Sequence, residues 1–147
     1  MTATSELMAV GLSAPLAARL GDGGSIRADQ KYTAATNTAA FTATGAQVAG
    51  AAQVVLDLTG SLAGDLAITL PTAANIVAAI PYPSVGENYR LRVINTGGGH
   101  TWTVTTNTGL TLTGTMTVAT NTWRDFIVTL TSLTAVAVQA IGTGTQS

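Results

Sequence analysis

The stretch VVLDLTGSLAGDLAITL, residues 54–70, decides the fold class. Val54, Leu56 and Leu58 recur at every second position, and the same alternation resumes at Leu66 after a glycine-bounded break. A period of two places alternate side chains on opposite faces of an extended chain, with one face buried. The stretch therefore predicts two half-buried strands joined by a turn.

The same alternation continues outward toward the C-terminus. It recurs in residues 89–94, 102–104, 110–118, 123–131 and 135–141, with Gly- and Asn-rich turns between the segments. About seven short strands at such spacing are typical of an all-β sandwich or barrel. We assign residues 51–142 to this β-domain. Residues 143–147 are predicted to be a flexible tail.

One short helix interrupts the predicted strands. Thr72 is a good N-cap, and Ile76, Val77 and Ile80 follow as one apolar stripe. Pro81 and Pro83 then end the helix, because proline has no backbone N–H to continue it.

Residues 1–50 are rich in Ala, Gly and Thr and show little periodicity. A short helix is expected after Ser13, with Leu16 and Leu20 on one side and Gly21 at its end. Residues 32–50 carry no charge and too little apolar surface to fold alone. They fit either a disordered tail or an extended arm that becomes ordered on a neighbouring subunit. Disordered tails are usually more charged, so we favour an N-terminal arm over residues 1–50.

Charge is scarce: 9% of the residues are charged and the net charge is −1. A charge-poor surface favours association, although a monomer solubilised by its many hydroxyl groups is the alternative. The cations do not form the basic stripe that nucleic acid binding needs, so no nucleic acid partner is expected. Polar residues break the apolar runs and Glu6 precedes any cation, so neither a membrane span nor a secretory signal is expected.

No catalytic or metal-binding pattern stands out. The chain has no cysteine, and its one histidine, His100, has no carboxylate close in sequence, so it is interpreted as a turn residue. A triad whose members are distant in sequence stays open. Asp57 and Asp65 occupy polar positions of their strands and are expected to be exposed, and residues 97–99 lack the signature of a phosphate loop. We therefore expect no enzyme activity, cofactor or metal.

The two tryptophans have two interpretations. Core packing is favoured for both, because each lies in an alternating strand. Trp123 shares a face with Asp125 and Ile127 and is the better interface candidate of the two. Arg90 and Arg92 are expected to share one strand face. The interface candidates are Leu16, Leu20, Arg27, Tyr32, Phe41, Arg90, Arg92, Trp123 and Arg124.

Residues 66–140 resemble a β-module of tailed-bacteriophage virion proteins. The resemblance rests on LPTAANIVAAIP (70–81), VGENY (85–89), VINTG (93–97) and TVTTNTGLTLTG (103–114). A short chain with one module and an N-terminal arm is most similar to capsid decoration (cement) proteins. Head and tail fibres share such modules, but a fibre would be longer and repetitive, and no repeat is evident here.

The resemblance implies a small jelly roll or β-sandwich that forms dimers or trimers. Such proteins are made in the host cytoplasm and bind the outside of an icosahedral capsid, where they bridge major capsid subunits. The alternative is a receptor- or glycan-binding module of a fibre, with Trp102 or Trp123 as an exposed platform.

Overall fold

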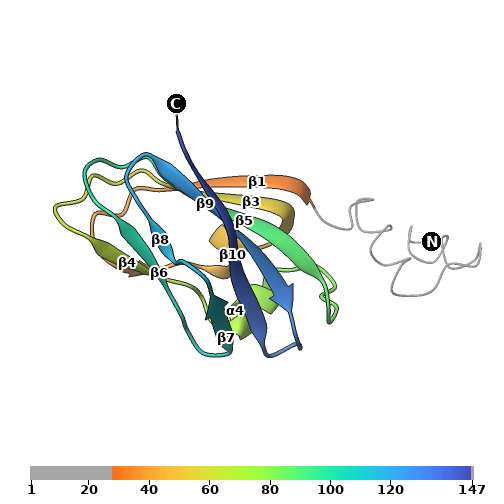
Figure 1. Cartoon of the computed structure of the whole chain (residues 1–147). Coiled ribbons are helices and arrows are strands. Elements are labelled where there is room, and N and C mark those ends of the chain that lie inside the picture. The colour runs from red at the N-terminus through yellow and green to blue at the C-terminus, as the bar shows by residue number, and fades with distance from the viewer. Residues whose placement is uncertain (1–27, 147) are drawn as a thin grey trace, which may run out of the picture.

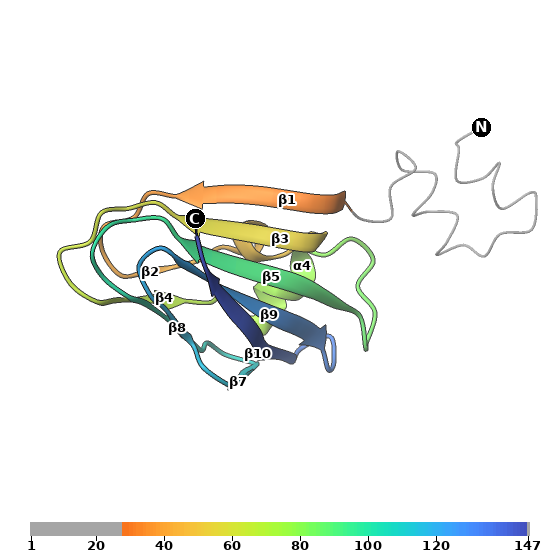
Figure 2. The same cartoon turned by 45° about the horizontal axis from the view of Figure 1, so that its top comes forward.

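The computed structural model describes residues 28–146, which form two packed β-sheets and two short helices (Figures 1 and 2). Sheet A has six strands in the order β1 (Ala28–Ala35), β3 (Ala51–Leu58), β5 (Asn88–Asn95), β9 (Thr122–Leu130), β10 (Val136–Thr145) and β7 (Leu110–Thr113). Sheet B has four, in the order β2 (Phe41–Thr42), β4 (Leu66–Thr69), β6 (Trp102–Thr105) and β8 (Thr117–Val118). The helices are α3 (Gly45–Val48) and α4 (Ala73–Ala78).

Successive strands alternate between the two sheets from β1 to β8, and β9 and β10 then complete sheet A. As a result β1, β3 and β5 run parallel in sheet A, and β2, β4 and β6 run parallel in sheet B. The all-β prediction is confirmed. The jelly roll is not confirmed, because five of the eight strand pairings are parallel, whereas a jelly roll is built from antiparallel Greek keys.

The core lies between the sheets and is formed by the alternating apolar residues. Val54, Leu56 and Leu58 are completely buried, as the alternation predicted. Trp102 is also completely buried, so the prediction that it packs in the core is confirmed. The ring of Phe41 meets it edge-on at a centroid distance of 5.6 Å.

The two helices have threonine N-caps. The predicted helix is α4, capped by the Thr72 hydroxyl, which accepts a hydrogen bond from the backbone N–H of Asn75. The sequence predicted no helix within residues 32–50, so α3, which has only four residues, was missed. Thr44 and Gln47 form a reciprocal capping box there, so the local signal was present although no apolar stripe accompanied it.

Residues 28–50 were assigned to an arm, and for these residues that prediction is wrong. Strand β1 pairs with β3 along its length, and β2 pairs with β4, so this segment folds on its own chain. Backbone hydrogen bonds need no large side chain, and small residues such as Ala35 and Ala43 fill the core beneath. The predicted helix with Leu16 and Leu20 lies outside the described residues.

The C-terminal boundary also changes. Strand β10 continues to Thr145 and pairs with β9, so residues 143–145 belong to the sheet rather than to a flexible tail. Gly144 explains the extension, since the indole of Trp123 lies against its backbone where any side chain would collide.

Three successive turns stack on one another at one end of the sandwich. The N–H of Thr59 donates to the carbonyl of Ala35 at 2.9 Å, and the N–H of Gly97 donates to the carbonyl of Leu58 at 2.9 Å. A Cβ at Gly60 would collide with the carbonyl of Asn37, and one at Gly97 with the carbonyl of Gly60. Glycine is therefore required here by the contact between backbones.

We expect Gly60→Ala to destabilise the fold by about 2 kcal/mol, because the turns must separate to admit a methyl group. Gly98→Ala is the matched control, since a Cβ there has no neighbour within 4 Å, and it should change stability by less than about 0.5 kcal/mol. Urea denaturation of both variants measures the difference. Equal unfolding midpoints would show that the turns are not tightly stacked.

Candidate functional site

The face of sheet A that points away from sheet B is here called the outer face. It carries arginine, aspartate, glutamine and aromatic side chains. Strand register arranges them in rows that cross the sheet. One row contains Gln30, Gln53, Arg90 and Ile127; the next contains Tyr32, Val55, Arg92 and Asp125; and the third contains Ala34, Asp57, Ile94 and Trp123.

Arg92 is the centre of the outer face. Its Nε and Nη2 donate to the two carboxylate oxygens of Asp125 at 2.7 and 2.8 Å, a bidentate pair. Its guanidinium carbon lies 4.1 Å from the ring centroid of Trp123, a cation–π contact. Hydrogen bonding to Asp125 raises the pKa of Arg92 above its usual value, so the guanidinium remains charged.

Arg90 is less fully paired. Its Nη1 lies 4.0 Å from Oδ2 of Asp125, beyond hydrogen-bond distance, and its side chain is 46% exposed. The Asp125 side chain is only 8% exposed, so one buried carboxylate serves two guanidinium groups. Both arginines lie on the outer face, as the sequence predicted.

A second carboxylate, Asp57, is also buried, which corrects the expectation that it is exposed. The hydroxyl of Tyr32 donates to its Oδ2 at 2.7 Å and the hydroxyl of Thr96 donates to its Oδ1 at 2.6 Å. Neighbours from β1 and from the turn after β5 thus supply the hydrogen bonds that make burial tolerable. The phenol ring of Tyr32 remains 63% exposed.

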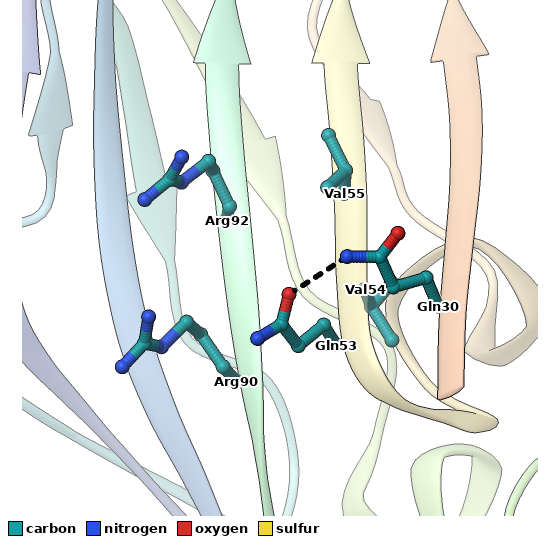
Figure 3. Close-up of a pocket in the computed structure, with 6 residues that line it drawn as sticks. All are labelled: Gln30, Gln53, Val54, Val55, Arg90 and Arg92. Atoms are coloured by element: carbon teal, nitrogen blue, oxygen red, sulfur yellow. Dashed lines mark hydrogen bonds between the residues drawn. The ribbon is translucent and has the colours of Figure 1, made fainter. Parts of the chain in front are cut away.

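A shallow hollow with a volume of about 160 Å³ opens on this face across β1, β3 and β5 (Figure 3). Its lining residues are Gln30, Gln53, Val54, Val55, Arg90 and Arg92. The amide of Gln30 donates to Oε1 of Gln53 at 3.1 Å, which closes one side of it. The side chains of Arg90 and Arg92 extend from β5 toward β9, so these two side chains border the hollow on one side and the two amides border it on the other.

The structure brings together four of the interface candidates, namely Tyr32, Arg90, Arg92 and Trp123. It places Phe41 in sheet B against Trp102, and Arg124 donates from Nε to the carbonyl of Thr117 at 2.7 Å. Leu16, Leu20 and Arg27 lie outside the described residues. Sequence analysis missed Gln30, Gln53 and the role of Asp125, because their proximity depends on strand pairing rather than on local pattern.

Neither tryptophan stands free as a platform. Trp102 is completely buried, and the indole of Trp123 is contacted by the guanidinium of Arg92 and by the backbone of Gly144. A sugar ring needs an open aromatic face to stack on. Trp123 is therefore better placed to support Arg92 than to bind a sugar.

His100 does have a carboxylate neighbour, which sequence proximity did not reveal. Parallel pairing of β4 and β6 brings Asp65 Oδ1 to 3.5 Å from His100 Nδ1, and the N–H of Thr101 donates to the same oxygen at 2.8 Å. Asp65 is exposed, as predicted, with its side chain 72% accessible. The described part of the chain holds no cluster of three or more metal-ligating side chains, and no helix in it is long and apolar enough to cross a membrane.

Tyr32 should have a pKa above the usual tyrosine value of 10.0, chiefly because its hydroxyl donates to Asp57. Its contribution to stability is therefore present below pH 10 and is lost as the pH rises through the raised pKa. We expect Asp57→Asn to lower the pKa of Tyr32, and Asp65→Asn, the control, to leave it unchanged. NMR titration of the tyrosine rings measures this, and an unchanged pKa in Asp57→Asn would contradict the assignment.

The Arg92–Asp125 pair should show a coupling free energy of about 1 kcal/mol in a double-mutant cycle of Arg92→Gln and Asp125→Asn. The bidentate geometry favours a measurable value, and the partial exposure of Arg92 limits it. Thermal denaturation at low and high salt checks the cycle. Additive single-mutant effects at low salt would show that the pair is not coupled.

Comparison with protein-family models, with curated proteins and with solved structures found no match. The comparisons therefore assign the chain to no family.

Proposed function

We propose that this protein is a non-enzymatic structural component of a virion, which binds the outside of an icosahedral capsid and cements neighbouring major capsid subunits. The observation that carries the proposal is the outer face of sheet A. It gathers Arg90, Arg92, Trp123 and Tyr32 on one wide sheet of a protein that is otherwise poor in charge. Arginine, tryptophan and tyrosine are the residues enriched at the energetic centres of protein interfaces.

Exposed strand edges support a role in association. Within residues 28–146 the edges of sheet A are β1 and β7, and β1, eight residues long, pairs with β3 on one side and with no strand on the other. Lysine is the usual guard of such an edge. Here the ammonium group of Lys31 donates instead to the carbonyl of Ala49 at 3.2 Å. The positive charge therefore lies against the backbone of its own domain. This edge is available to pair with a strand of a neighbour.

The mechanism we infer is mass action on the assembled shell. A protein that binds only the assembled state stabilises that state, and many weak contacts related by symmetry add together. Self-association as a dimer or trimer would multiply the contacts further. Binding of this kind does not depend on the jelly-roll connection that the resemblance implies.

A receptor- or glycan-binding module of a fibre is the second candidate from the sequence. No contact on the outer face favours it, because Trp102 is buried and Trp123 is held by Arg92. The exposed ring of Tyr32 is the aromatic group that such a module would use.

Co-sedimentation with shells assembled from the major capsid protein encoded in the same genome tests the proposal. We expect saturable binding in fixed ratio to the capsid subunits and a higher temperature of shell disruption. Tyr32→Ala should weaken binding several-fold, whereas Leu133→Ala, which removes a side chain 52% exposed and outside the outer-face rows, should not. A monomer with no affinity for shells would overturn the proposal, and binding of only a few copies per particle would favour the fibre.

A further inference from the structure

We propose that the hollow of Figure 3 binds a carboxylate, the side chain of an Asp or Glu on the surface of the protein partner. This inference rests on the proposed function and names the chemistry of the partner. It is carried by the unequal pairing of two arginines, by the free amide beside them and by the shape of the hollow.

The two arginines that line the hollow are unequally paired. Arg92 is satisfied by two hydrogen bonds to Asp125, whereas Arg90 approaches the same carboxylate only at 4.0 Å. Among the described residues, Arg90 has no hydrogen-bond partner for its guanidinium. Asp57, the other carboxylate of the outer face, accepts from the hydroxyls of Tyr32 and Thr96. Arg90, whose side chain is 46% exposed, is therefore the less fully paired of the two arginines.

An amide donor lies beside Arg90. Gln53 uses its Oε1 to accept from Gln30, so its own NH₂ group makes no hydrogen bond within the described structure. Figure 3 shows that this NH₂ group is turned toward Arg90. The pairing of Gln53 with Arg90 across β3 and β5 holds the two donors side by side.

This set of donors suits a carboxylate. A guanidinium presents N–H groups in a planar fork that matches two carboxylate oxygens, and the Gln53 amide adds a further donor. The hollow is small and shallow, so it has room for the tip of one side chain. Val55 lines it and reduces competition from water for the ion pair.

A protein carboxylate fits the surroundings better than an acidic sugar. A sugar ring would need a free aromatic face beside the hollow, and the indole of Trp123 is already stacked with Arg92. The outer face continues instead into side chains such as Ile94 and Ile127, in register with Trp123 and Arg90. Such a flat and partly apolar surface suits contact with another protein.

Two measurements test the inference on the full chain. In co-sedimentation with shells, Arg90→Gln and Gln53→Ala should weaken binding, the first by about tenfold. Arg90→Lys keeps the charge but loses the fork, so it should lose less. Gln139→Ala is the matched control for Gln53→Ala, because Gln139 lies in the same row outside the hollow.

The second measurement does not need shells. The peptide acetyl-Ala-Glu-Ala-amide is titrated into ¹⁵N-labelled protein, and the Arg90 Nε–H and Gln53 side-chain amide signals are followed by NMR. We expect both signals to shift, with no shift for the matching Gln peptide and none in Arg90→Gln.

The outcomes separate this inference from the proposed function. If Arg90→Gln and Gln53→Ala bind shells as well as the unaltered protein does, carboxylate binding in the hollow is overturned and the cement function is not. If the Glu peptide shifts the NMR signals but the protein does not bind shells, carboxylate binding in the hollow is supported and the cement function is overturned. If the signals respond to neither peptide, carboxylate binding in the hollow is overturned. If glucuronate, titrated in the same way, shifts the signals more than the Glu peptide does, the hollow is assigned to an acidic glycan instead of a protein.

Discussion

The in-register stacking of β1, β3 and β5 is the constraint on which the rest of the structure depends. The turns that follow these strands touch through their backbones, and Gly60 and Gly97 are the residues that permit the contact. Because the turns coincide, equivalent positions of the strands coincide as well, and Gln30, Gln53 and Arg90 fall in one row. A slip of one residue would turn every one of these side chains to the opposite face. The outer face is thus a consequence of turn geometry as much as of its own residues.

The ion pairs on this face contribute more to recognition than to stability. Exposed pairs add little to the free energy of unfolding, because water competes with them and side-chain entropy opposes them. Asp125 is nearly buried and Arg92 stacks on Trp123, so that part of the cluster is rigid. Rigidity lowers the cost of ordering side chains when a partner binds. Arg90, left with an unsatisfied guanidinium beside this fixed group, is the member of the cluster that remains available.

The sequence predicted local features well and long-range pairing poorly. Alternation identified the buried side chains of β3 and β4, and the Thr72 cap identified α4, because both signals lie within a few residues. Strand β1 was missed, since it is held by backbone hydrogen bonds to β3 and contributes a small side chain, Ala35, to the core. The shared face of Arg90 and Arg92 followed from their spacing. Their partner Asp125 did not, because it lies 33 residues from Arg92 in the chain.

The position of the hollow relative to the open edge of sheet A links the two features that favour association. Gln30 lies on β1, the edge strand of sheet A in the described part of the chain, so the hollow begins on the edge strand itself (Figure 3). A partner segment that places a carboxylate against Arg90 would therefore have its own backbone close to β1. Charge pairing supplies specificity and orientation at such a site, and backbone pairing supplies affinity that depends little on sequence. The edge strand carries one lysine, Lys31, and its ammonium group donates to the carbonyl of Ala49. Such an edge, next to the incompletely paired Arg90, is the arrangement that this combination requires.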